Sequence, residues 1–375
     1  MKDQSPGLLG QASSKADRPV LTWALCTPTL NRIDILLQSL RCTLAQTRLP
    51  TEVIIVDAST NWEANRDKVA ALFVSHPQIR LVYLPCGIRS ITVQRNLATQ
   101  AASADILLCL DDDTMMHPDC AETILRVYEQ DTEGRIAGVT AKNDPVSPRP
   151  ETTLERKSTV SEDRAKRGWS ATDSRLMQWV WREIFMMNTL RLFVPFDQGR
   201  PLATPEAVAQ LGQPDLSPVV SMFGYAMTVR RSVALREPFE SHLLAYAPCE
   251  DTDATYRFSR HGLLVMSRKA RLHHFEIAAA RLKRRQVAAL FLMNVAFFTR
   301  KHSDAPDIHR KRYFHLARRR VFAEFLKDGL SRRWSVPQVS GTLYALRQAR
   351  EIFALPDADM GKRYEEMQRE VLAWK

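Results

Sequence analysis

The sequence predicts an α/β fold, in which a mostly parallel sheet flanked by helices is followed by a helical C-terminal region. Between residues 20 and 110, short apolar runs alternate with stretches of helical period, the pattern of a parallel sheet with helical crossovers. No comparable strand pattern follows His274. Hydrophobic residues make up 45% of the 375 residues and charged residues 25%, which is typical of soluble globular proteins and excludes a disordered chain.

Four strands and three helices are expected in the first part of the chain. Strand-like runs cover 20–27, 52–58, 79–84 and 105–110, and helical stretches cover 31–45, 66–74 and 92–102. Each connection is long enough for a right-handed helical crossover, so the four strands are expected to run parallel. In such a sheet ligands bind beyond the carboxyl ends of the strands, and the residues just after each strand become candidates for function.

The middle of the chain departs from this rhythm. Residues 144–175 are turn-rich and polar, and residues 176–196 are rich in Trp, Met and Phe at helical spacing. The second stretch is either a helix packed in the core or a lid that binds a substrate or faces a membrane. Further strands are expected at 219–229 and 262–267, and only helices after His274.

These patterns divide the chain into three parts. The expected parts are a disordered tail at 1–19, an α/β domain at 20–275 with a variable insertion at 144–215, and a helical basic region at 276–375.

Cysteine use and the N-terminal sequence point to the cytoplasm. The six cysteines form no CxxC pair and no cluster with zinc-ligand spacing, as expected of reduced thiols. The polar N-terminus lacks the apolar core of a signal peptide, and no apolar stretch reaches the roughly 18 residues of a membrane span. We therefore expect a cytoplasmic protein that does not cross a membrane.

Carboxylates follow two of the predicted strands. Asp57 ends the second strand, and Asp111, Asp112 and Asp113 directly follow the fourth. Adjacent carboxylates repel one another, so a cation or a strong set of donors is needed to hold three of them together. Oxygen ligands suit a hard cation such as Mg²⁺ or Mn²⁺. The alternative is a solvated acidic turn that caps the following segment.

A second acidic cluster lies downstream, in the string CEDTD. In a helix starting there, Glu250 and Asp253 share a face, and Asp251 points elsewhere, toward a ligand held at the strand ends. A carboxylate in a water-poor pocket can serve as a general base. The alternative is an ordinary helix N-terminus, where acidic residues complement the helix dipole.

Two further pairs carry chemistry. His273 or His274 can supply a nitrogen ligand to the same cation, although a histidine is more often structural. Arg89 and Arg95 lie on either side of the turn after the third strand, where they either neutralise a diphosphate or solvate a helix surface.

Six short motifs follow one another along residues 20–275. They are CTPTLNR, VIIVDAST, GIRSITVQRNLA, LLCLDDDT, CEDTD and LHH. In this order and spacing they resemble the motifs of family-two inverting glycosyltransferases with the GT-A fold.

The resemblance implies a role for each matched residue. Pro28, Thr29 and Asp57 would hold the base and ribose of a nucleotide-sugar donor, and Arg89 and Arg95 would face that donor. Asp111 to Asp113 would form the DxD motif, with Asp112 near the ribose and Asp111 and Asp113 at the metal. His274 would complete the metal site, with His273 as the alternative. Asp251 would be the catalytic base, beside Glu250 in the same "ED" element.

The implied reaction is metal-assisted single displacement from a UDP- or dTDP-linked sugar to a glycan or lipid-linked acceptor, as in polysaccharide assembly. The family often has two acidic residues where this chain has Asp57 followed by Ala58, and the variable insertion lies where acceptor-binding elements differ. Two alternatives stay open: a nucleotidyltransferase on a similar sheet, and an inactive membrane-associated assembly partner.

The net charge of +11 is concentrated in one stretch. Residues 281–320 contain 12 Lys and Arg against 2 Asp and Glu, while residues 1–280 are neutral. The apolar run with basic ends in this stretch fits a helix lying in a membrane interface, and equally a helix packed on the α/β domain. We expect an anionic membrane surface as a partner and no nucleic acid, because no recognition motif accompanies the charge.

Overall fold

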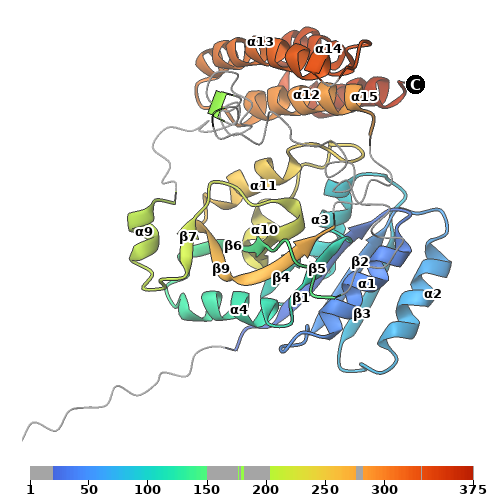
Figure 1. Cartoon of the computed structure of the whole chain (residues 1–375), viewed down its shortest axis with the longest axis vertical. Helices are drawn as coiled ribbons and strands as arrows, with labels where there is room; N and C mark the ends of the chain where they lie inside the picture. The colour runs from blue at the N-terminus through green and yellow to red at the C-terminus, as the bar shows by residue number, and fades with distance from the viewer. Residues whose placement is uncertain are drawn as a thin grey trace, which may run out of the picture.

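The computed structural model describes residues 20–149, 176, 179–180, 203–275, 282–330 and 332–374. The tail at 1–19 and nearly all of the aromatic stretch at 176–196 lie outside the described residues, and the expectations for them stay predictions. The α/β fold class is confirmed: helices cover both faces of a central sheet, and a helical region follows it (Figure 1).

The first half of the domain alternates strands and helices as expected. The elements are β1 (Trp23–Thr29), α1 (Ile33–Leu44), β2 (Glu52–Asp57), α2 (Trp62–Phe73), β3 (Arg80–Pro85), α3 (Ile91–Ala101) and β4 (Ile106–Cys109). β1 lies parallel between β2 and β4, and β3 runs parallel to β2 at the edge of the sheet. The carboxyl ends of these four strands therefore meet on one side of the sheet.

The second half of the sheet is mixed. β8 (Met227–Arg230) is antiparallel to β4 and to β6 (Ile136–Asn143), and β9 (Leu263–His274) is parallel to β6. β5 (Thr114–Met116) and β7 (Leu216–Pro218) are antiparallel to β9. The strand expected at 219–229 forms only at its end, because the preceding residues make a loop and the short 3₁₀ helix η3 (Gly224–Ala226). The remaining helices are α4 (Cys120–Gln130), α9 (Pro205–Ala209), α10 (Arg231–Arg236) and α11 (Glu250–Phe258).

Successive residues of the central strands enter two separate cores on opposite faces of the sheet. Leu25 and Leu108 pack into the core covered by α1, α2 and α4, whereas Cys26 and Cys109 pack into the core covered by α3, α10 and α11. Because both faces are buried, the strands appear in the sequence as continuous apolar runs.

The C-terminal region comprises α12 (Arg284–His302), α13 (Pro306–Leu330), α14 (Pro337–Ile352) and α15 (Asp357–Leu372), and these helices form a further core that also takes in Leu243, Ala247 and Tyr256 of the α/β domain. The apolar run of α12 lies inside this core, where Leu290, Met293 and Phe297 are at most 1% exposed. The interpretation of this run as a helix in a membrane interface is therefore wrong, because protein already encloses its apolar side chains. None of the described helices combines the length and the apolarity needed to cross a bilayer.

Candidate active site

Acidic residues and a histidine meet where β4 and β9 end and β5 begins. Asp111 to Asp113 link the end of β4 to the start of β5. β5 pairs antiparallel with the last residues of β9, in a register that sets Thr114 opposite His274. The strand pairing thus brings the two halves of the site together from distant parts of the sequence.

Asp111, Asp113 and His274 form a candidate metal centre. Each offers one ligand atom, and the three ligand atoms lie within 4.8 Å of one another. His274 Nε2 is 3.2 Å from Asp113 Oδ1. Two carboxylates suit Mg²⁺ or Mn²⁺, and an imidazole nitrogen beside them also accepts transition metals. The donor set therefore fits a divalent cation.

The two neighbouring histidines have different surroundings. The His274 ring stacks on Tyr225, with 4.3 Å between centroids and 8° between planes. His273 instead places Nδ1 2.8 Å from the carbonyl oxygen of Asp144. Adjacent side chains of a strand point to opposite faces, so only one of the pair can face the carboxylates. The geometry favours His274 over His273 as the ligand.

Asp112 is buried in a polar cluster beside the candidate metal centre. Thr29 Oγ1 donates a hydrogen bond to Asp112 Oδ2 at 2.7 Å, and Arg32 Nη2 lies 2.5 Å from Asp112 Oδ1. Complete burial raises the pKa of Asp112 to about 7, although Arg32 and Thr29 favour the charged form. Thr29 and Asp112, which were expected to contact the nucleotide-sugar donor, are hydrogen-bonded to each other. Contact of either residue with the donor stays a prediction.

Arg32 was not among the candidate residues. It also lies 3.2 Å from Asp113 Oδ2, so one guanidinium serves two of the three carboxylates. The available signal was its place in CTPTLNR, immediately after a buried strand. Its partner could not be inferred, because the contact depends on β1 lying beside β4.

Asp57 organises the loop after β2. Its carboxylate accepts hydrogen bonds from the Ser59 backbone N–H at 2.8 Å, from Asn65 Nδ2 at 2.9 Å and from Tyr83 Oη at 2.6 Å. Asp57 is 0% exposed, and Pro28 is buried in β1. Neither side chain presents a surface for a base or ribose here, so their contact with a donor stays a prediction.

Arg95 joins the two acidic clusters. Its Nη2 lies 2.7 Å from Asp111 Oδ1, and its Nη1 lies 2.9 Å and 3.0 Å from the two carboxylate oxygens of Glu250. Arg95 is 1% exposed and its guanidinium is taken up by these carboxylates, and its contact with a donor stays a prediction. The Arg95 guanidinium thus holds Asp111 and Glu250 in place. Glu250, which the resemblance sets beside the catalytic base, is an ion-pair partner of Arg95.

Gly224 allows this arrangement to close. Its carbonyl oxygen accepts a hydrogen bond from Arg95 at 3.2 Å, and its N–H donates to Asp251 Oδ2 at 3.2 Å. A Cβ at this position would lie 2.7 Å from Arg95 Nη2 and 3.1 Å from Glu250 Oε1. Only a residue without a side chain fits between the two clusters, and no sequence pattern signalled this.

Asp251 lies in the first turn of α11, with partners different from those of Glu250. Oδ1 accepts the Thr252 N–H at 2.7 Å, and Oδ2 accepts the Gly224 N–H. Burial raises the pKa of Asp251 against the opposing effect of these donors. A carboxylate of raised pKa is a better proton acceptor, provided that it remains ionised.

Of the two arginines that were expected to face the donor, Arg89 and Arg95, only Arg89 has an exposed side chain.

Comparison with known proteins links the first part of the α/β domain to a family. The model of glycosyl transferase family 2 matches residues 24–187. A relative from Haloferax volcanii, glucosyl-dolichyl phosphate glucuronosyltransferase, is 31% identical over 129 residues, which is 34% of this chain and 40% of that protein. The chain thus spans less than half the length of this relative.

One solved structure supports the fold, and a second aligns more weakly. The crystal structure of S. aureus TarS aligns with a TM-score of 0.50 and 13% identity, covering 94% of this chain and 52% of TarS. The crystal structure of S. aureus TarS 1-349 aligns with a TM-score of 0.48 and 14% identity, covering 93% and 91%. The family-model match thus identifies residues 24–187 as a glycosyl transferase family 2 region, and the crystal structure of TarS supports a GT-A-like fold for the chain.

Proposed function

We propose that this family-2 glycosyltransferase transfers a sugar from a UDP- or dTDP-linked donor to a glycan or lipid-linked acceptor, with inversion. One observation carries the proposal: Asp111, Asp113 and His274 converge within 4.8 Å. Arg95 connects this group to the helix that carries Asp251. A cation site and a separate carboxylate are the two groups that such a transfer needs.

Asp111, Asp113 and His274 would hold Mg²⁺ or Mn²⁺. When bound, the cation would act as a Lewis acid that neutralises charge on the leaving diphosphate. Arg32 balances the charge of Asp112 and Asp113 in the absence of any ligand, so the site can form before the donor arrives.

Asp251 would remove the proton of the acceptor hydroxyl as that hydroxyl attacks the sugar. The proton moves to an Asp251 carboxylate oxygen, the new glycosidic bond forms, and the nucleoside diphosphate leaves. A single base without a covalent nucleophile on the donor predicts one displacement and therefore an inverted anomeric centre. The hydrogen bonds from Gly224 and Thr252 support this role by fixing the orientation of the carboxylate.

A basic groove between α13 and α14 supports an anionic membrane surface as a partner. The groove has a volume of about 530 Å³ and is lined by Asp307, Arg310, Lys311, Phe314, Arg318 and Arg350. Its four cations face a single carboxylate, and clustered cations of this kind attract anionic headgroups.

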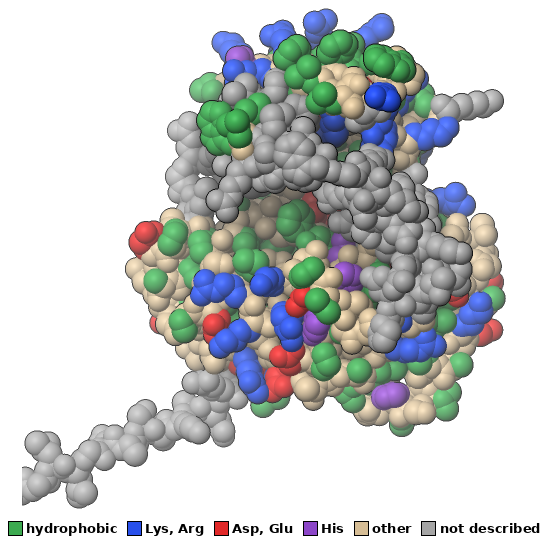
Figure 2. All heavy atoms as spheres, in the orientation of Figure 1, with side chains coloured by type: hydrophobic (Ala, Val, Ile, Leu, Met, Phe, Trp, Pro, Cys, Tyr) green, Lys and Arg blue, Asp and Glu red, His purple; other side chains and the backbone are tan. Residues whose placement is uncertain are grey.

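Exposed aromatic side chains also lie in the C-terminal helical region. Phe322, Phe325 and Trp334 are 57%, 55% and 83% exposed, and hydrophobic groups lie beside Lys and Arg on the helical region (Figure 2). A basic surface with exposed aromatic groups favours peripheral attachment to a membrane on its cytoplasmic side. The relative from Haloferax volcanii acts on a glucosyl-dolichyl phosphate, by its name, and a lipid-linked acceptor for this chain agrees with such attachment.

A donor panel tests the reaction. The full chain is incubated with Mn²⁺ and UDP-glucose, UDP-N-acetylglucosamine, UDP-glucuronate or dTDP-glucose, and nucleoside diphosphate release is measured. We expect slow release from at least one donor even without an acceptor, with water as the nucleophile, and proton NMR should show the released sugar with inverted anomeric configuration. Retention of configuration would contradict the single displacement. No release from any donor, with or without Mn²⁺, would contradict the donor class.

A further inference from the structure

Residues 243–249, which lead into α11, have an unusual backbone. Ala245, Ala247 and Cys249 have φ angles of 55°, 44° and 70°, in the left-handed region that residues with a Cβ rarely adopt. Such conformations persist only where the surroundings hold them in place, and they gather at functional sites. This segment therefore stores strain immediately before Glu250 and Asp251.

The segment determines how α11 begins. Cys249 is the N-cap residue of α11, with φ 70° and ψ 14° instead of the extended conformation usual at that position. The Glu250 N–H bonds to the Ala247 carbonyl oxygen at 3.1 Å, and the Asp253 N–H bonds to the Cys249 carbonyl oxygen at 3.0 Å. The direction of the first turn, and with it the position of Asp251, follows from these strained residues.

The α/β domain holds one side of the segment. Ser90 Oγ donates to the Leu243 carbonyl oxygen at 2.6 Å, and the Ala245 N–H donates to the Arg89 carbonyl oxygen at 2.7 Å. The Pro248 carbonyl group of the same segment is held from the C-terminal helices instead.

Buried polar groups of α12 and α15 hold that other side. Asn294 Nδ2, from α12, donates to the Pro248 carbonyl oxygen at 2.7 Å, and Tyr364 of α15 donates to Asn294 Oδ1. Asn294 is 0% exposed. From α15, Gln368 Oε1 accepts the Leu244 N–H at 2.9 Å. Leu243 and Ala247 also pack in the same core as the apolar side chains of these helices.

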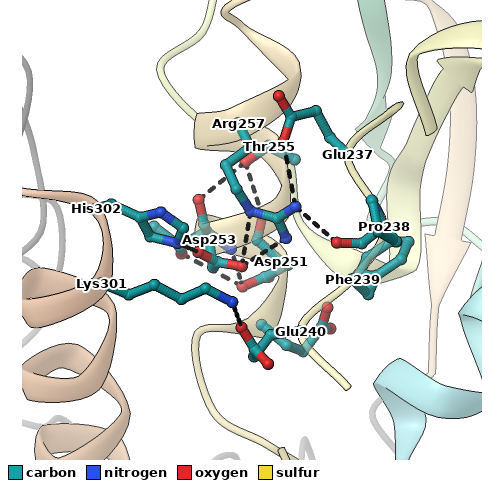
Figure 3. A network of polar contacts seen from close by, with 12 residues as sticks. Glu237, Pro238, Phe239, Glu240, Asp251, Asp253, Thr255, Arg257, Lys301 and His302 are labelled. Atoms are coloured by element: carbon teal, nitrogen blue, oxygen red, sulfur yellow. Dashed lines mark hydrogen bonds and ion pairs between the residues drawn. The ribbon is translucent and has the colours of Figure 1, made fainter. Parts of the chain in front are cut away.

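A second set of contacts links α12 to α11 itself (Figure 3). His302 Nε2 lies 2.9 Å from Asp253 Oδ1, and Arg257 Nη2 lies 2.7 Å from Asp253 Oδ2. Lys301, next to His302, forms an ion pair with Glu240. α12 thus holds both the start of α11 and the strained segment before it.

We infer that the C-terminal helices belong to the catalytic apparatus, because Asn294 and Gln368 hold the strained 243–249 segment in the conformation that positions Asp251. Asn294 and Gln368 are positioning residues, which act through the backbone without touching substrate. This inference rests on the proposed role of Asp251 as the base.

The test compares Asn294→Leu with Tyr313→Phe in the full chain. Tyr313 donates one buried hydrogen bond in the same core, and its acceptor is the Leu292 carbonyl oxygen of α12 at 2.9 Å and not a group of the 243–249 segment. UDP release from the best donor of the panel gives kcat, calorimetry with UDP and Mn²⁺ gives Kd, and thermal unfolding gives Tm. A misplaced base lowers kcat ten- to a hundredfold in Asn294→Leu. The Kd for UDP stays within twofold, and Tyr313→Phe keeps its kcat at a similar Tm.

Two outcomes overturn the inference, and they are distinguishable from failure of the proposed function. Unchanged kcat in Asn294→Leu, with turnover abolished in Asp251→Asn, would remove the inference alone. Unchanged turnover in Asp251→Asn would remove the base assignment, and this inference with it. If Asn294→Leu does not fold, Tyr364→Phe takes its place, because it keeps the ring in the core and removes only the hydrogen bond to Asn294. A severalfold loss of kcat is then expected, and no loss would overturn the inference.

Discussion

At the scale of single residues, the two adjacent histidines differ in that only His274 belongs to the candidate metal centre. His274 faces Asp113, and His273 faces the backbone of Asp144, although the two follow one another in the sequence. Each replacement removes one imidazole from the end of the same strand. The pair therefore offers a matched comparison that no other part of the candidate metal centre provides.

Replacing His274 with Ala should weaken the binding of UDP in the presence of Mn²⁺ by about tenfold or more, because a metal ligand is lost. Replacing His273 with Ala should leave it within twofold. Calorimetry with and without Mn²⁺ measures both. Equal losses in the two variants would mean that the effect comes from the strand end and not from ligation.

At the scale of elements, Gly224 sets how closely η3 approaches α11. In Gly224→Ala, the new Cβ would contact Arg95 at 2.7 Å and push it from Glu250 or Asp111. We expect kcat for UDP release to fall at least tenfold, because the orientation of Asp251 depends on the same loop. Gly329→Ala adds its Cβ in open space and serves as the control, with unchanged turnover. Full activity in Gly224→Ala would show that the close approach has no role.

Asp253, inside α11, links the helix to α12 and responds to acid. Arg257 and His302 lower the pKa of Asp253 to about 2, against the effect of burial. Since the folded-state pKa lies below the unfolded value, the carboxylate stabilises the fold above about pH 4, and this stabilisation is lost as the pH falls toward 2. The shift corresponds to about 2 kcal/mol.

Urea unfolding of the wild type and Asp253→Asn between pH 6 and pH 3 checks this expectation. The variant should be less stable at pH 6, and the difference should shrink as the pH falls. A difference that is constant with pH would rule out the ion-paired carboxylate as its source.

Periodicity in the sequence predicts the strands and helices around the site better than it predicts which side chains contact one another there. The apolar runs predicted β1 to β4, and with them the place of Asp57 and Asp111 at the strand ends. The choice between His273 and His274 needed the register of β5 on β9, which no local pattern encodes. The sequence left Arg95 as either a diphosphate ligand or a solvated surface cation, because its ion pair with Glu250 joins residues that are far apart in the chain.

At the scale of the whole molecule, the excess of basic residues and the candidate catalytic residues lie in different parts of the chain. The candidate metal centre and Asp251 lie in the α/β domain, whereas residues 281–320 carry 12 Lys and Arg against 2 Asp and Glu. α12 is mostly buried, so the exposed basic surface is on α13 and its groove with α14. We therefore expect mutations to separate the proposed membrane attachment from the proposed sugar transfer.

Binding to vesicles should depend on the groove cations. Replacing the four of them with Gln (Arg310, Lys311, Arg318 and Arg350) should weaken sedimentation with vesicles of phosphatidylcholine and 30% phosphatidylglycerol by at least a hundredfold, at about 1 kcal/mol for each cation. The control changes four exposed cations of the α/β domain in the same way (Arg66, Lys68, Arg126 and Arg236). Equal binding of both variants, or wild-type binding to pure phosphatidylcholine, would contradict the assignment.

We propose that Asp251, on α11, takes the proton of the acceptor hydroxyl while the donor is held at the ends of the strands. The most direct measurement is the rate of UDP release by Asp251→Asn, together with its Kd for UDP in Mn²⁺. We expect the rate of UDP release to fall about a hundredfold or more in Asp251→Asn, because the group that removes the proton is lost. The Kd for UDP should stay within twofold of the wild-type value. Release at the wild-type rate by Asp251→Asn would contradict the proposal.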